Sequence, residues 1–94
     1  MFSIEQLQAF VATVEVGSFS AAARRLGKAQ SVVSQHIINL EVDCDTALFE
    51  RSGRYPTLTE AGNKLLPQAH ALLSQHQRLK NSALALTDSA PTEV

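Results

Sequence analysis

The chain has little of several features that mark whole classes of protein. Among its 94 residues there is one cysteine, Cys44, and no tryptophan. An internal disulfide is therefore impossible, which favours a reducing compartment. The amino terminus lacks the basic and then apolar pattern of a secretory signal, and no apolar run is long enough to span a bilayer. Three scattered histidines and the cysteine have no metal-ligand spacing, so we expect a cytoplasmic protein without membrane span, metal or cofactor.

An excess of positive charge is also missing. Eight Lys and Arg against nine Asp and Glu give a formal net charge of −1. Domains that bind nucleic acids are often strongly basic, so such a partner requires the cations to be concentrated locally. A hydrophobic fraction of 45% is ordinary for a globular domain and argues against disorder.

Hydrophobic spacing predicts two helices at the start of the chain. A capping-box pattern opens the first, over about residues 4–16, and Gly17 ends it. Ser18 and Ser20 are both candidate N-caps for a second, shorter helix that ends at Leu26. The alanines in this second helix are small enough to let another helix approach closely.

A third helix is predicted over about residues 30–42, after a very short connection. Its inward-facing apolar residues, at i, i+4 and i+7, are Val33, Ile37 and Leu40. The opposite stripe is mostly short and polar, unlike the Lys and Glu mixture of an ordinary solvated face; it comprises Ser31, Ser34, Gln35 and Ile38. Two short helices joined by a tight turn containing glycine make a helix-turn-helix, here about residues 19–38, whose second helix typically enters a DNA groove.

Turn-forming residues then predict a small two-strand wing. Residues 52–56 have turn composition, and residues 57–58 can return as a short strand, so that Arg51 and Arg54 would lie at the tip. Thr59 is expected to cap the helix that follows.

The last helix, predicted over residues 60–87, has the clearest periodicity in the chain. Its apolar stripe has the 3.5-residue repeat of a helix that packs lengthwise against another helix. The stripe comprises Leu65, Ala69, Leu72, His76, Leu79, Ala83 and Leu86. A chain of this size has little else to cover the stripe, so we expect a second copy as its partner. Residues 88–94 are expected to form a hinge or disordered tail.

In order and spacing, these motifs resemble the N-terminal DNA-binding domain of LysR-type transcriptional regulators, over roughly residues 4–87. The matching positions are Leu7 and Phe10; Gly17-Ser18-Phe19-Ser20, Ala22-Ala23 and Leu26; Gln30, Val33-Ser34, Ile37 and Leu40-Glu41; Leu48-Phe49, Arg51 and Arg54; and Leu58-Thr59-Glu60-Ala61-Gly62.

The resemblance implies a fold, a function and a setting. The fold is mainly α, with a winged helix-turn-helix over residues 1–59 followed by a long dimerisation helix. The implied function is sequence-specific binding of operator DNA by a homodimer, or by a tetramer of the intact protein, in the bacterial cytoplasm and at the nucleoid. In the family an effector-sensing domain follows a hinge, so we expect an excised domain or a truncated regulator that lacks this domain.

The resemblance also implies which residues contact DNA. Gln30, Ser31, Ser34 and Gln35 match the family's contact positions at the start of the third helix. Glutamine can pair with adenine through two hydrogen bonds, and an apolar side chain can touch a thymine methyl. The full predicted set is Ser20, Arg25, Gln30, Ser31, Ser34, Gln35, Ile38, Arg51, Arg54 and Thr59.

Three of these roles have plain structural alternatives. Arg51 can equally pair with Glu41 or Glu50, whereas DNA contact is favoured for Arg54. Ser20 and Thr59 can act as simple helix caps, which is compatible with contact to a phosphate. The outer stripe of the third helix can be a solvated face.

The chain departs from the family pattern in three places. Ala29 stands where Ser or Thr usually caps the third helix. Cys44-Asp45 stands where a Leu-Gly pair is common, so the turn into the wing is expected to differ. Gln35 and Ile38 replace basic residues, which weakens the electrostatic part of DNA binding.

Two other function classes compete with DNA binding. The first is a hydrolase or other enzyme, for which Ser34, His36 and Asp43 are the only set resembling a nucleophilic triad. Residues two apart on one helix point in divergent directions, so no triad forms and no enzyme is predicted. A dimerising interaction module or inhibitor, which keeps the fold but does not bind DNA, is the remaining alternative. Net charge and the non-basic outer stripe support it.

Overall fold

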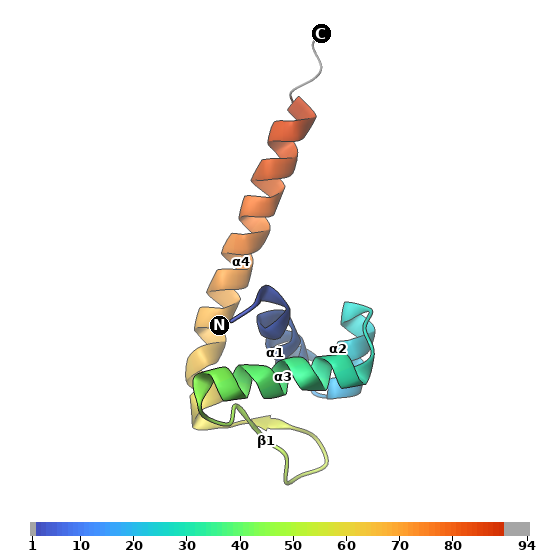
Figure 1. Cartoon of the computed structure of the whole chain (residues 1–94), viewed down its shortest axis with the longest axis vertical. Coiled ribbons are helices and arrows are strands. Elements are labelled where there is room, and N and C mark those ends of the chain that lie inside the picture. Colours follow the sequence, from blue (N-terminus) through green and yellow to red (C-terminus); the bar gives the residue numbers. More distant parts are fainter. Residues whose placement is uncertain (1, 90–94) are drawn as a thin grey trace.

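The computed structural model describes residues 2–89 as four helices and a two-strand sheet (Figure 1). In chain order these elements are α1 (Ile4–Val16), α2 (Phe19–Leu26), α3 (Gln30–Cys44), β1 (Phe49–Glu50), β2 (Thr57–Leu58) and α4 (Glu60–Ser89). The predicted mainly α fold, with a winged helix-turn-helix and a long final helix, is confirmed. Two helices extend further than expected, because α3 continues to Cys44 and α4 to Ser89.

Local capping explains where the first two helices begin and end. Ser3 and Gln6 form the predicted capping box, in which each side chain accepts from the other's backbone N–H. Of the two candidate caps for α2, the structure uses Ser18, whose hydroxyl accepts from the backbone N–H of Ala21 at 3.1 Å. Ser20 therefore lies inside the first turn of α2, exposed to solvent.

The core lies between α1, α2 and α3, and the wing closes it from below (Figure 1). The largest fully buried side chains include Phe10, Ile37, Leu40 and Leu48. α2 packs closely against α1 and α3 because its inner positions are the buried alanines Ala22 and Ala23. Aromatic rings join wing and helices: the ring of Phe49 meets that of Phe10 edge-on at 5.6 Å and that of Phe19 at 5.9 Å between centroids.

The turn from α3 into the wing keeps a helix-ending geometry without glycine. Asp45 adopts a left-handed conformation with φ 57° and ψ 37°, and its N–H donates to the carbonyl oxygens of Glu41 and Val42. Thr46 donates to the Glu41 carbonyl at 3.1 Å, which completes the usual αL termination of a helix. An aspartate thus occupies the αL position that glycine favours.

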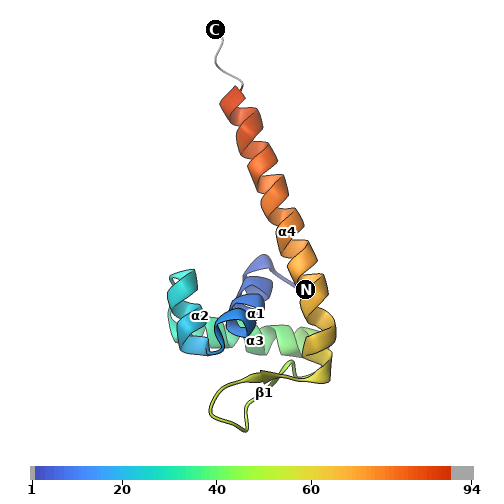
Figure 2. The ribbon, with the colours of Figure 1, turned by 180° about the vertical axis from the view of Figure 1, so that it is seen from behind.

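α4 projects away from the rest of the molecule (Figures 1 and 2). Thirty residues at 1.5 Å per residue make it about 45 Å long, in a molecule with principal extents of 60 × 24 × 20 Å. It continues through Pro67. Of the segment 88–94, predicted as a hinge or tail, Asp88 and Ser89 are the last residues of α4, and residues 90–94 lie outside the described residues.

The first turns of α4 are seated on the core by small residues. A Cβ at Gly62 would overlap the carbonyl oxygen of Leu48 and the side chain of Leu58, so only glycine allows this approach. Further along α4, Ala69 is 2% exposed and belongs to the core cluster. The base of α4 is therefore part of the winged body, and the wing is fixed against it.

Candidate nucleic-acid interface

The helix-turn-helix has the predicted geometry. α2 ends at Leu26 and α3 begins at Gln30, so only three residues, the first of which is Gly27, separate the helices. Val33, Ile37 and Leu40 are fully buried, and this fixes the rotation of α3 about its axis. The opposite side, here called the outer face, is exposed at Gln30, Ser31, Gln35 and Ile38 and half-buried at Ser34. α3 thus presents the predicted contact residues on one side.

The start of α3 carries no side-chain cap. Ala29 makes no side-chain hydrogen bond to the first turn, as its methyl group requires. The first N–H groups of a helix carry a partial positive charge and attract anions. Gln30 and Ser31 lie at this same end and are exposed, so both side-chain and backbone donors are available there to a phosphate.

Gln35 is oriented by a neighbour that the sequence reading did not single out. Its side-chain nitrogen donates to the Oδ1 atom of Asn39 at 2.9 Å, one helical turn further on. The i, i+4 spacing places such side chains together. The other hydrogen of that nitrogen and the Oε1 atom stay available, and these two groups match the N7 and N6 edge of adenine.

The arginines predicted to contact DNA differ in whether they form ion pairs with carboxylates of the same chain. Arg25 is in an ion pair with Glu15, and the same glutamate lies 3.5 Å from the Nε2 atom of His70 on α4. Arg54 is exposed and takes part in none of the ion pairs formed by residues 2–89. Its guanidinium lies 5.5 Å from the centre of the Tyr55 ring, so the wing tip carries an accessible cation.

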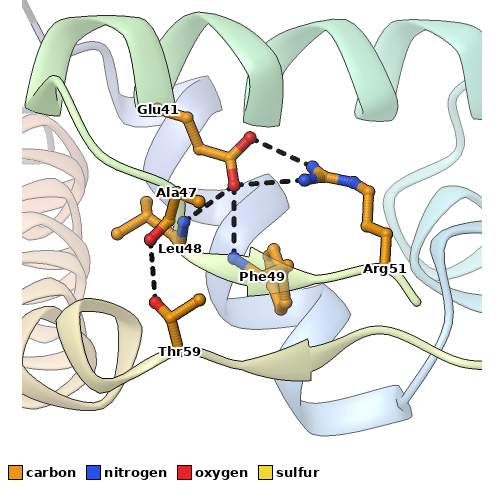
Figure 3. Close-up of polar contacts among 6 residues, drawn as sticks. All are labelled: Glu41, Ala47, Leu48, Phe49, Arg51 and Thr59. Atoms are coloured by element: carbon orange, nitrogen blue, oxygen red, sulfur yellow. Dashed lines mark hydrogen bonds and ion pairs between the residues drawn. The ribbon is translucent and has the colours of Figure 1, made fainter. Parts of the chain in front are cut away.

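Arg51 pairs with Glu41, one of the two carboxylates that the sequence offers as alternative partners. Its Nη2 and Nη1 atoms donate to the carboxylate of Glu41 at 3.1 and 3.3 Å (Figure 3). Between Arg51 and Glu50 no ion pair forms in the described structure. Arg51 therefore braces the wing against α3, and Glu41 is a site residue that the sequence analysis treated only as one possible partner.

Thr59 caps α4 as predicted, and both of its donors are engaged within the chain. Its hydroxyl accepts from the N–H of Gly62 at 3.0 Å and donates to the carbonyl oxygen of Ala47 at 2.8 Å (Figure 3). Its backbone N–H donates to Leu48 at 3.0 Å. Thr59 thus has no donor left for a phosphate in this conformation, whereas the hydroxyl of Ser20 is exposed, 3.4 Å from that of Ser18.

The apolar stripe of α4 divides into two parts. Leu65 and His76 are half-buried and Ala69 is buried, so the chain covers part of the stripe itself. The exposed fraction is 49% at Leu72, 65% at Leu79 and 73% at Leu86, and Ala83 is also exposed. Ala69 therefore offers almost no surface to a second chain, and the accessible seam begins at Leu72.

Other chemistry is sparse in the part of the chain that the structure describes. Within residues 2–89 no group of His, Cys, Asp and Glu side chains could hold a metal ion, and no helix is long and apolar enough to cross a membrane. Burial, followed by the nearby charges of Asp43 and Glu41, raises the pKa of the Cys44 thiol. Cys44 is therefore less reactive than an ordinary surface thiol.

Comparisons with known proteins agree with this geometry. The family model described as bacterial regulatory helix-turn-helix protein, lysR family, matches residues 4–63. The HTH-type transcriptional regulator AceR of Acinetobacter baumannii is 49% identical over 83 residues, which cover 88% of this chain and 28% of that protein. The chain thus spans less than a third of the length of this relative.

Two similar solved structures are complexes with DNA. The crystal structure of the CbnR_DBD-DNA complex matches with a TM-score of 0.80 and 34% identity, covering 90% of this chain and 98% of that one. The BenM_DBD/benA site 1 DNA complex matches with a TM-score of 0.82 and 32% identity, covering 93% of this chain and 98% of that one. Each of those two chains thus matches at least nine-tenths of this chain.

Proposed function

Because the chain belongs to the lysR family of bacterial regulatory helix-turn-helix proteins, we propose that it binds double-stranded DNA in a sequence-specific manner and so regulates transcription. The outer face of α3 carries this proposal. It is accessible, mostly polar and rigidly mounted on the three buried residues of the same helix. A surface of this kind suits the reading of base edges in the major groove.

Roles on the outer face follow from the chemistry of each side chain. Gln35 pairs with adenine, since its amide offers one acceptor and one free donor beside the hydrogen bond to Asn39. Ile38, which is 46% exposed, contacts a thymine methyl. Gln30, Ser31 and the uncapped start of α3 hold a phosphate or a base edge, and Ser34 contributes its hydroxyl at the margin.

Cations outside α3 supply the charge that the outer face lacks. Arg54 at the wing tip reaches a phosphate or the minor groove, where a guanidinium is attracted by the negative potential. Ser20 and Arg25 lie on α2, and Arg25 must exchange Glu15 for a phosphate to take part. The total charge available is small, so we expect weak binding to random sequences and a moderate salt dependence.

The proposed assembly is a homodimer formed along α4. In a single chain the leucines from Leu72 onward expose apolar surface to water. A second α4 buries this seam in the manner of a coiled coil. A dimer places two copies of α3 at a fixed separation, which matches paired half-sites in an operator. The setting that fits this activity is the bacterial nucleoid.

Fluorescence anisotropy with a pool of genomic oligonucleotides at two salt concentrations tests the proposal. We expect salt-sensitive binding that favours one sequence class. Gln35→Ala should relax base preference, whereas Arg54→Ala should weaken binding to all sequences alike and lower the salt slope by about one. Absence of binding at low salt would refute DNA binding.

One observation favours a second candidate function. Arg25 and Arg51 are both held by carboxylates, and the outer face of α3 carries no cation. A dimerising module that pairs with related chains without binding DNA would have such a surface. In that case the anisotropy assay stays flat at low salt, while mixing with a DNA-binding relative produces mixed dimers.

A further inference from the structure

The carboxylate of Glu41 is a junction between α3 and the wing (Figure 3). Its Oε2 atom accepts from the backbone N–H of Leu48 at 2.8 Å and from that of Phe49 at 3.2 Å. The guanidinium of Arg51 donates to both carboxylate oxygens. One side chain on α3 thus binds three residues in or next to β1, namely Leu48, Phe49 and Arg51.

Burial makes this junction sensitive to its partners. The side chain of Glu41 is only 13% exposed, and a charge in that position needs hydrogen bonds and a counter-charge to replace lost water. The two backbone N–H groups and Arg51 supply both. Removing one partner therefore leaves the other groups unsatisfied, and we expect the start of β1 to loosen.

Arg51 is held from a second side as well. Its guanidinium carbon lies 5.6 Å from the centre of the Phe19 ring, and this ring packs edge-on against Phe49. Arginine suits such a place because its planar fork pairs with two carboxylate oxygens while its face lies on an aromatic ring. The residue therefore connects β1 with α2 as well as with α3.

We propose that Arg51 is a positioning residue that acts through Glu41, and that this pair, the wing lock, sets where Arg54 lies relative to α3. Arg54 follows three residues later, in the exposed loop between β1 and β2. The proposal rests on the proposed DNA binding for its functional part. Its structural part, an ordered start of β1 that depends on Glu41, stands independently of DNA.

The sign of the effect of Glu41→Gln separates positioning from simple electrostatics. Removing a negative charge near DNA should strengthen binding if charge alone matters. The wing lock predicts the opposite, a roughly three- to tenfold loss of affinity for the preferred sequence. Glu50→Gln is the matched control, since Glu50 is an exposed carboxylate on β1, the strand next to the residues that Glu41 binds; it should leave affinity equal or slightly raised.

Arg51→Lys gives the second test, because lysine keeps the charge but not the fork. A direct phosphate contact tolerates lysine, whereas the wing lock needs two parallel hydrogen bonds. We expect Arg51→Lys to weaken binding with an unchanged salt slope. The double variant of Arg51→Lys and Glu41→Gln should bind DNA no more weakly than the weaker of the two single variants. Wild-type affinity of Arg51→Lys, or a salt slope lower by about one in Arg51→Gln, would overturn the proposal.

A measurement without DNA keeps the two proposals distinguishable. Amide hydrogen exchange at Leu48 and Phe49 should be faster in Glu41→Gln than in the wild-type chain, with the helical circular dichroism unchanged. If exchange speeds up but the wild-type chain binds no DNA, the proposed function fails and the structural part of the wing lock stands. If exchange is unchanged in the folded variant, the wing lock is refuted whatever the DNA result.

Discussion

The two halves of α4 have the same apolar repeat and different surroundings. In the first half, Gly62 touches the wing segment and Ala69 is buried in the core of the same chain. In the second half, Leu79 and Leu86 are mostly exposed. Periodicity thus indicates which face of a helix is apolar, but what covers that face depends on which part of the helix lies against the body of the chain. Leu65 in the first half packs against the core, whereas the small Ala83 in the second half is exposed.

The largest expected effect comes from charging the buried half. Ala69→Glu places a carboxylate in the core without a partner and should lower the free energy of unfolding by roughly 3–5 kcal/mol, a large part of a small domain's stability. Urea unfolding followed by circular dichroism measures this. Ala71→Glu, an exposed position two residues away, is the control; an equal loss in both would show that the two faces do not differ.

Charging the exposed half should affect assembly instead. Leu79→Glu is expected to weaken dimerisation by about a hundredfold, because two carboxylates would face each other in the seam. The unfolding free energy of the monomer should change by less than about 0.5 kcal/mol. Sedimentation equilibrium over a concentration series gives the dissociation constant. Ser74→Glu, on the opposite side of α4, should leave it unchanged; a normal dimer of Leu79→Glu would place the interface elsewhere.

A smaller effect is expected at Asp45, in the turn from α3 into the wing. Asp45 has a positive φ, which an L-residue adopts at some cost and glycine freely. Asp45→Gly should raise the free energy of unfolding by about 0.5–1 kcal/mol. Val42→Gly, in the exposed helical part of α3, should lower it by about 1 kcal/mol. The same sign in thermal unfolding of both variants would contradict this account of the turn.

The smallest effect concerns the thiol beside the base of α4. Burial, and then the charges of Asp43 and Glu41, raise the pKa of Cys44, so less thiolate is present at any pH below that pKa. Alkylation by iodoacetamide at pH 8 should be several-fold slower in the folded chain than in urea. Asp43→Asn should speed it slightly, since one of the two carboxylates is removed. Equal rates in folded and unfolded chains would mean that the fold does not shield the Cys44 thiol.

Much of the fold could be predicted from local patterns. The capping box at Ser3, the helix end at Gly17 and the cap at Thr59 all depend on residues three or four positions apart, so the sequence displays them directly. The N-cap of α2 was ambiguous because Ser18 and Ser20 both fit locally. The packing of Phe19 against Phe49 brings the start of α2 onto the wing, and such long-range contacts are not visible in a local window.

The sequence predicted which residues of α3 are exposed better than it predicted the partner of each side chain. The outer face of α3 follows from the period of its buried residues, and Ser31, Gln35 and Ile38 are exposed as expected. Arg51 was open between DNA and a carboxylate, since only the folded chain brings it to Glu41, ten positions away. Asn39 lies one turn after Gln35 and was overlooked, although i, i+4 spacing of two amides was a usable signal.

The sequence by itself determined the helices, their apolar faces, the helix-turn-helix and the long repeat of α4, because each depends on spacing along one element. The tertiary structure alone decided that Ala69 belongs to the chain's own core while Leu79 does not. It also decided that Arg51 braces the wing and that Arg54 remains accessible. Such outcomes depend on which surfaces meet across the fold, and a buried charge takes whichever partner the packing brings within reach.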